Sequence, residues 1–316
     1  MSANSSDKPR VVVLCGPTGV GKTGLSLDLA EAFGGNIVGA DSMQVYRHMD
    51  IGTAKPAPEE RKRVPHHMID VADPDEDFSA GRYARMAREI IVELNQAGVL
   101  PVLVGGTGLY IKACLHGLFR KHSADTAILE RLAGEAREQG VLALHERLKV
   151  CDPDTAGRVH PNDLFRIVRA LEIFESTGLP ASGHRQAHRF ADDPFDALKI
   201  CLHMERRALY ERINRRVDAM MAAGFEDEVR GLLARGYGPD LKSMQSIGYR
   251  HISDFLAGTV PREKAVETMK QDTRRYAKRQ ETWFRADPDM VWVDKKEGLE
   301  KAVFLIEKFL RYRGDK

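Results

Sequence analysis

Short runs of consecutive apolar residues alternate with segments of helical periodicity along the first third of the chain. Three of these runs predict buried strands, at Val11–Cys15, Asn36–Ala40 and Pro101–Val104. Strands that are apolar throughout and separated by helices are typical of a parallel sheet covered by helices on both faces. The pattern therefore predicts an α/β fold built on a doubly wound parallel sheet.

The pattern changes after about residue 116. Apolar positions at helical spacing predict helices over Thr126–Gln139 and Leu164–Ser176, and no segment between them has the character of a buried strand. We therefore expect a helical insertion domain over residues 116–199. The catalytic core is then formed by residues 1–115 together with residues 200–316.

Strands and helices of the core are expected to resume after the insertion. Apolar runs at Ile200–Met204 and Val291–Val293 predict two further strands. Helical periodicity predicts three helices, over Ala208–Ala223, Glu226–Arg235 and Arg262–Arg285.

Composition adds limits to this picture. The 316 residues are 43% hydrophobic and 30% charged, enough for a sizeable core, and the net charge of +2 does not by itself indicate a nucleic-acid partner. The first ten residues lack the apolar segment of a leader, and no apolar run approaches the length of a membrane span, so we expect a cytoplasmic protein without a membrane partner. The four cysteines are far apart in sequence, which favours neither a zinc site nor a disulfide framework.

A phosphate-binding motif follows the first predicted strand. The segment Gly16–Thr23 matches G-x-x-x-x-G-K-[ST] and leads directly into a predicted helix, so the sheet is expected to be P-loop NTPase-like. In such a loop backbone N–H groups and a lysine surround a phosphate, and the final hydroxyl can reach Mg²⁺. The expected phosphate contacts are Thr18, Gly19, Val20, Gly21, Lys22 and Thr23, with Thr23 the expected metal ligand.

The motif does not identify the reaction, because kinases, ATPases and other transferases share it. Residues that follow the neighbouring strands, Asp41 and Gly105-Gly106-Thr107, should face the same crevice, since ligands bind beyond the carboxyl ends of parallel strands. Asp41 has three possible roles: holding Mg²⁺, accepting a proton from a nucleophile, or capping a following helix. The strand at Pro101–Val104 ends without the acidic residue that usually binds metal in kinases.

Arg216 lies at the edge of an apolar stripe on the helix predicted over Ala208–Ala223. The stripe includes Ile213 and Met220. Desolvating a guanidinium is costly without an anionic partner, and a diphosphate is a suitable one. A side chain that reaches the surface and pairs with a carboxylate is the alternative.

The segment Lys270–Arg285 carries six basic and two acidic residues. On a helix, Arg274 and Lys278 form one ridge and Arg275 and Arg279 the next. This side of the helix is a candidate surface for nucleic-acid phosphates, with an ordinary solvated face as the alternative.

The adjacent histidines His66 and His67 could be considered as metal ligands. Adjacent side chains point apart on any regular element, so we favour a structural role for both.

Taken together, these segments resemble the bacterial tRNA dimethylallyltransferases, also called tRNA isopentenyltransferases, along almost the whole chain. The resemblance rests on eight blocks in order: Gly16–Thr23, Asp41–Tyr46, Met49–Pro56, Pro65–Asp70, Gly105–Tyr110, His160–Asp163, Ser246–Arg250 and Thr273–Arg285.

The resemblance implies transfer of a dimethylallyl group from dimethylallyl diphosphate to N6 of adenosine 37 in tRNA, with Mg²⁺ and release of diphosphate. Asp41 becomes the expected base for the exocyclic amine, and Thr107 the expected contact to the adenosine. Lys22, Thr23 with Mg²⁺, and Arg216 are expected to stabilise the leaving diphosphate.

The resemblance also implies a tRNA surface and a clamp formed by the insertion on the anticodon stem-loop. The target base must leave its stack to react. The expected contacts are Asp41, Ser42, Met43, Gln44, Thr107, Arg166, Arg169, Ser243, Met244, Gln245, Arg274, Arg275, Lys278, Arg279 and Gln280.

Two other functions compete with this hypothesis. In a P-loop small-molecule kinase, the loop holds ATP and Asp41 deprotonates an alcohol. In an RNA-binding protein, a nucleotide is only a structural ligand and no turnover occurs. Recognition of one stem-loop requires only a monomer, which is the expected state.

Overall fold

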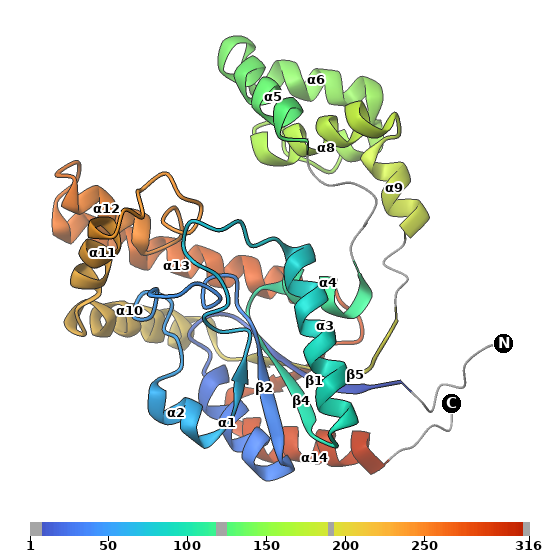
Figure 1. Cartoon of the computed structure of the whole chain (residues 1–316), viewed down its shortest axis with the longest axis vertical. Coiled ribbons are helices and arrows are strands. Elements are labelled where there is room, and N and C mark those ends of the chain that lie inside the picture. Colours follow the sequence, from blue (N-terminus) through green and yellow to red (C-terminus); the bar gives the residue numbers. More distant parts are fainter. Residues whose placement is uncertain (1–7, 118–124, 189–192, 312–316) are drawn as a thin grey trace. The chain divides into compact units, whose positions relative to one another are not determined.

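The computed structural model describes residues 8–117, 125–188 and 193–311 (Figure 1). It divides into two compact units, residues 1–115 with 193–316 and residues 116–192. The first residues of the chain, in which we expected no leader, lie outside the described ranges. The strand expected from Ile200 begins at Asp196, so the core resumes before the predicted boundary at residue 200.

A six-stranded parallel sheet forms the centre of the first unit. The strand order is β3-β2-β4-β1-β5-β6, which places the strand that precedes the P-loop in the middle. Val12 of the central strand lies opposite Val102 on one side and Leu198 on the other. The strands are β1 Arg10–Cys15, β2 Gly35–Ala40, β3 His66–His67, β4 Leu100–Gly105, β5 Asp196–His203 and β6 Val291–Asp294.

Helices cover both faces of this sheet, because the strands point apolar side chains toward both faces. Val13 of β1 belongs to a buried cluster with Tyr83 of α3 on one face. Leu14 belongs to a second cluster, with Leu25 of α1 and Ile306 of α14, on the other face. The predicted doubly wound α/β fold is confirmed. The helices of this unit are α1 Lys22–Phe33, α2 Pro58–Arg63, α3 Ala80–Gln96, α4 Gly108–His116, α10 Arg206–Ala222, α11 Phe225–Ala234, α12 Tyr249–Leu256, α13 Arg262–Arg285, the 3₁₀ turn η1 Lys295–Glu297 and α14 Gly298–Arg311.

In its described residues, the second unit consists of helices joined by turns and contains no strand. Its small core is formed by Leu132, Leu148, Ile167 and Leu171, all buried. The helix predicted over Thr126–Gln139 has those bounds, and the next predicted helix ends one residue later than expected. The helices are α5 Thr126–Gln139, α6 Val141–Cys151, α7 Pro153–Ala156, α8 Leu164–Thr177 and α9 Ala181–His188.

Across both units, none of the helices that the structure describes combines the length and the apolar character that a membrane crossing requires.

Candidate active site

The segment between β1 and α1 is the P-loop, and it forms a tight turn. Gly16 has φ +142°, and a Cβ on it would lie 2.6 Å from the carbonyl oxygen of Leu202, so only glycine fits at this point. Lys22 begins α1, and its Nζ donates to the carbonyl oxygens of Gly16 at 2.8 Å and Pro17 at 3.0 Å. The lysine therefore reaches back over the loop in which a phosphate is expected.

Three ionisable groups converge beside this loop. Burial lowers the pKa of Lys22 to about 8, with nearby Asp41 opposing the shift and Arg216 adding to it. Burial also lowers the pKa of Arg216, again opposed by Asp41 and reinforced by Arg212. Two cations face one carboxylate here, so the loop has an excess of positive charge that suits a diphosphate.

Arg216 points to the P-loop from α10. Its Nη1 donates to Thr18 Oγ1 at 3.4 Å, while Ile213 and Val217 on the same helix are buried. Arg216 therefore lies against the P-loop, and within the described residues it forms no ion pair of the kind considered as the alternative. Its contact with a diphosphate stays a prediction. Arg212, one turn earlier on the same helix, donates from Nε to the Gly19 carbonyl at 2.9 Å.

Asp41 directly follows β2 and shapes the next turn. Its Oδ1 accepts from the backbone N–H groups of Met43 at 2.8 Å and Gln44 at 3.3 Å. Its Oδ2 accepts no hydrogen bond from any residue within the described ranges. The chain continues as turns, and the next helix begins only at Pro58, so a helix cap is not the role of Asp41.

Thr107 connects the ends of β2 and β4. Its N–H donates to the Ala40 carbonyl at 3.1 Å, and its Oγ1 accepts from the Ser42 N–H at 3.0 Å. The hydroxyl also lies 3.3 Å from Ser42 Oγ. The structure thus brings Asp41 and Thr107 to one edge of the sheet, as predicted from the strand ends.

Helix α13 crosses this edge (Figure 1). One of its side chains connects the P-loop to the loop that follows β4. Gln280 Oε1 accepts from the Thr18 N–H, and its Nε2 donates to the Gly106 carbonyl, both at 2.8 Å. Tyr276, four residues earlier, lies beside Thr107 and Gln280, and burial raises its pKa to about 12. Tyr276 was not among the residues expected in the site, although its spacing from Gln280 places both on one helix ridge.

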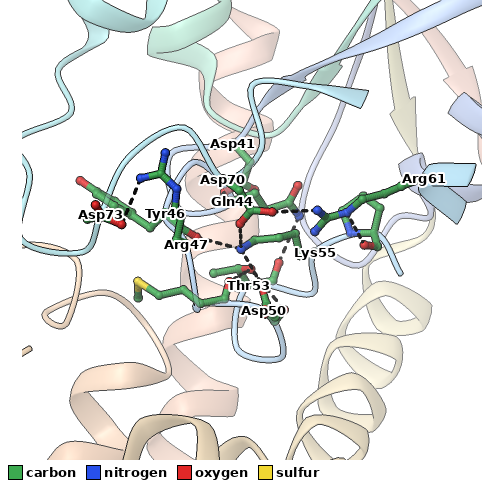
Figure 2. A network of polar contacts seen from close by, with 12 residues as sticks. Asp41, Gln44, Tyr46, Arg47, Asp50, Thr53, Lys55, Arg61, Asp70 and Asp73 are labelled. Carbon is green, nitrogen blue, oxygen red and sulfur yellow. Dashed lines mark hydrogen bonds and ion pairs between the residues drawn. The ribbon is translucent and has the colours of Figure 1, made fainter. Parts of the chain in front are cut away.

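A folded loop, residues 41–56, carries Asp41 and Gln44 into the site (Figure 2). Lys55 is its centre: the side chain is 1% exposed, and its ammonium group donates to the Tyr46 carbonyl at 2.8 Å and to Asp70 Oδ1 at 2.7 Å. A third contact joins it to Asp50 Oδ1 at 2.5 Å. Gln44 Nε2 donates to the carbonyls of Thr53 and Ala54 within the same loop.

Glu228 of α11 holds the tip of this loop. Its carboxylate accepts from the backbone N–H groups of Asp50, Ile51 and Gly52, at 3.0, 2.6 and 3.1 Å. The Tyr249 hydroxyl donates to the same carboxylate at 2.6 Å. No sequence pattern pointed to Glu228, because residues so far apart in the chain meet only in the fold.

A pocket of about 770 Å³ opens between the loop and α10. Its lining includes Ile51, Ala54 and Met220, and also Arg216, which contacts the P-loop on its other side. A pocket of this size is typical of small-molecule sites, and its apolar wall adjoins the expected phosphate position.

The side chains expected to bind tRNA fall into two groups. Ser243 and Met244 are buried, Ser243 donates to the Pro74 carbonyl, and Gln280 is buried with its amide bound to protein. Gln245 is exposed and donates to the Pro239 carbonyl. The side chains of Ser243, Met244 and Gln280 are thus buried in this structure, and the expected contact of these residues with tRNA stays a prediction.

The basic side chains are placed differently. Arg275, Lys278 and Arg279 are exposed on α13, whereas Arg274 is half-buried and donates to Asn214 Oδ1 at 2.6 Å. In the second unit, Arg166 is exposed beside Asp163, and Arg169 pairs with the buried Glu172.

No group of three or more potential metal-ligating His, Cys, Asp or Glu side chains occurs within residues 8–117, 125–188 and 193–311. The four cysteines are unpaired thiols. His66 and His67 form β3 at the sheet edge, where they contact the Val64 carbonyl and the Asn36 amide, in agreement with a structural role.

Comparison with known proteins gives consistent similarities. A family model described as IPP transferase matches residues 44–287, and one described as isopentenyl transferase matches residues 9–78. The chain is 76% identical over 312 residues to the tRNA dimethylallyltransferase of Desulfosudis oleivorans, covering 99% of each chain. It is 51% identical to the enzyme of the same name from Geobacter sulfurreducens, covering 98% of this chain and 99% of the relative.

Two solved structures are similar over most of the chain. The full-length tRNA isopentenylpyrophosphate transferase from Bacillus halodurans has a TM-score of 0.72 at 42% identity, covering 96% of this chain and 97% of the other. A eukaryotic dimethylallyltransferase acting on tRNA has a TM-score of 0.80 at 29% identity, covering 97% of this chain and 81% of the other.

Proposed function

The chain belongs to the tRNA dimethylallyltransferase family, the IPP transferases, and we propose that it transfers a dimethylallyl group from dimethylallyl diphosphate to N6 of adenosine 37 in tRNA. The products are N6-isopentenyladenosine in tRNA and diphosphate. The observation that carries the proposal is the convergence of Lys22, Arg216 and Asp41 at the carboxyl ends of the strands. All these groups come from one chain, so we propose a monomer, active in the cytoplasm where tRNA is found.

The P-loop and Arg216 provide the site for the leaving group. As the allylic carbon–oxygen bond breaks, negative charge grows on the diphosphate and positive charge spreads over the allyl group. Lys22 and Arg216 are already held by the fold beside Thr18, so they stabilise that negative charge without large rearrangement. The apolar wall formed by Ile51, Ala54 and Met220 next to Arg216 suits the dimethylallyl chain.

Asp41 and Thr107 provide the site for the nucleophile. The exocyclic amine of adenine is a weak nucleophile, so it must be held close to the allylic carbon and lose a proton. Asp41 Oδ2 is the candidate acceptor of that proton, because Oδ1 is bound by the turn that follows. Thr107, whose hydroxyl is anchored on Ser42, is placed to orient the base.

The donor set for Mg²⁺ is small and fits the ion. The Thr23 hydroxyl lies in the first turn of α1 and makes no side-chain hydrogen bond to the residues that the structure describes, so it and diphosphate oxygens would hold the ion. An ion held by Thr23 would neutralise charge on the leaving diphosphate.

Mass analysis of nucleosides tests the proposed function. Unmodified tRNA incubated with the protein and dimethylallyl diphosphate should yield N6-isopentenyladenosine, and a tRNA with guanosine at position 37 should not react. The P-loop kinase alternative predicts transfer from labelled ATP to a metabolite instead. Label moving from ATP, with none moving from the prenyl donor to tRNA, contradicts the proposal.

A further inference from the structure

Trp283 is an exposed aromatic side chain in the last turn of α13. It keeps 45% of its surface exposed, whereas tryptophan is highly buried on average. Its five-membered ring packs against Gly108, where a Cβ would overlap Cγ, Cδ1 and Nε1 of the indole. The neighbouring Leu109 is 44% exposed. The indole N–H donates to no acceptor in the part of the chain that the structure describes.

This side chain lies at the rim of the candidate active site. Gly108 directly follows Thr107, the residue proposed to orient the target adenosine. Trp283 also lies one helical turn after Gln280, which binds the Gly106 carbonyl. The indole therefore packs against the segment that forms the nucleoside end of the site and keeps the rest of its surface exposed.

Two basic side chains lie on the same side of α13 as the indole. Arg275 and Arg279 precede Trp283 by successive steps of four residues, so all three lie on one side of the helix, and both arginines are exposed. Sites for unpaired nucleic-acid strands combine basic groups that follow the phosphates with aromatic rings on which bases stack. The arrangement has both components beside Thr107.

We propose, on the basis of the proposed function, that Trp283 stacks on an unpaired nucleobase adjacent to the target adenosine and positions the anticodon loop. When the target adenosine leaves its stack, the next nucleobase loses a stacking partner. The indole of Trp283 takes the place of that partner. Trp283 is thus a substrate-positioning residue. Gly108 contributes to this positioning, because a side chain there would displace the indole.

Fluorescence of single-tryptophan proteins tests the contact directly. The chain has two tryptophans, Trp283 and Trp292. Trp292 is on β6, and its ring contacts His203 and Arg285. In a Trp292→Phe protein, addition of an unmodified anticodon stem-loop should quench the emission of Trp283. In a Trp283→Phe protein, the emission of Trp292 should not change. Unchanged Trp283 emission in a protein that still modifies tRNA overturns the proposal.

Kinetics separate stacking from packing. Trp283→Leu keeps an apolar side chain over Gly108 but removes the ring, and should raise KM for tRNA by about 5- to 150-fold. KM for dimethylallyl diphosphate should not change, and Trp283→Phe should restore most of the tRNA affinity. The matched control is Phe304→Leu, since Phe304 is a 63% exposed aromatic residue on α14.

The outcomes distinguish this inference from the proposed function. A wild-type protein that forms no N6-isopentenyladenosine contradicts the function. A wild-type protein that modifies tRNA while Trp283→Leu has an unchanged KM contradicts only the stacking role. Equal losses in Trp283→Leu and Trp283→Phe also contradict it, because packing shape would then matter and the aromatic ring would not. Should Trp283→Leu fail to fold, the Trp292→Phe titration decides.

Discussion

Asp41 has two carboxylate oxygens in different situations. Oδ1 accepts two backbone N–H groups and fixes the turn at Met43 and Gln44, while Oδ2 is the oxygen proposed to take the proton from the adenine amine. In the proposed reaction, one side chain therefore both shapes the site and accepts the proton. Substitutions can separate these roles, because an amide retains the acceptor for the turn but loses the basicity.

Replacing Asp41 should affect the chemical step. We expect Asp41→Asn and Asp41→Ala each to lower kcat by about 10²–10⁴-fold, the usual effect of losing a general base. Binding of tRNA should change little in the asparagine variant. Single-turnover rates with saturating tRNA measure the effect. Near-normal rates for Asp41→Asn would assign the residue to the turn alone.

The lowered pKa of Lys22 gives the site a pH dependence. The lysine is charged below about pH 8 and loses its charge as the pH rises through that value. Because the charged form binds diphosphate, kcat/KM for dimethylallyl diphosphate should fall as pH rises through about 8. A Lys22→Arg protein should lack this fall, since its guanidinium stays charged. A profile that is unchanged by the substitution would exclude Lys22 as its source.

At the scale of elements, the loop of residues 41–56 lacks regular structure and depends on side chains for its shape. Two of its residues, His48 and Ala54, have positive φ values of 66° and 46°. Such conformations persist when surrounding contacts determine them. Lys55 supplies those contacts from inside the loop and Glu228 from outside, so the loop that presents Asp41 is fixed by ionic and backbone hydrogen bonds (Figure 2).

Lys55→Met should loosen this loop. The substitution leaves the Tyr46 carbonyl without its donor and removes both carboxylate pairings, which should cost about 1–3 kcal/mol of stability. We expect kcat to fall as well, because Asp41 and Gln44 lose their support. Urea unfolding and single-turnover rates measure the two effects. Lys62→Met, at an exposed lysine of α2, is the matched control and should change neither. A Lys55→Met protein as stable and active as wild type would contradict this role for the loop.

At the scale of the whole molecule, the net charge of +2 conceals an uneven distribution. Exposed basic groups, Arg275, Lys278 and Arg279, gather on the side of α13 that leads to the active site. A phosphate backbone lying along this helix displaces counterions, so its binding weakens with salt in proportion to the number of contacts.

Neutralising two of these groups should reduce the salt dependence of tRNA binding. For Arg275→Gln with Arg279→Gln, we expect the slope of log K against log salt to decrease by about 1.4 to 1.8. Filter binding over a range of KCl concentrations provides the slope. The control pair, Lys296→Gln with Lys301→Gln, removes two exposed charges near and on α14 and should leave the slope unchanged. An unchanged slope in the α13 pair would remove these arginines from the tRNA surface.

Local sequence determined much of this molecule. The apolar runs predicted every strand of the sheet except β3, and helical periodicity over Arg262–Arg285 predicted a helix with its observed bounds. These elements depend on periodicity and burial, which a short segment expresses by itself. The P-loop is equally local, because neighbouring glycines and Lys22 form it within one turn. Asp41 and Thr107 were predicted to meet because parallel strands end at a common edge.

Only the tertiary structure decided which distant residues complete the site. Lys55 meets Asp70, Glu228 meets the backbone at Ile51, and Gln280 joins the P-loop to Gly106, all over long separations in sequence. Spacing along one chain carries no information about such pairs. It was also the fold that buried Ser243 and Met244 and left Trp283 exposed at the rim. The sequence by itself thus determined most of the sheet, the phosphate loop and the chemistry that they favour. Packing between distant elements decided which side chains hold the loops in place and which remain exposed.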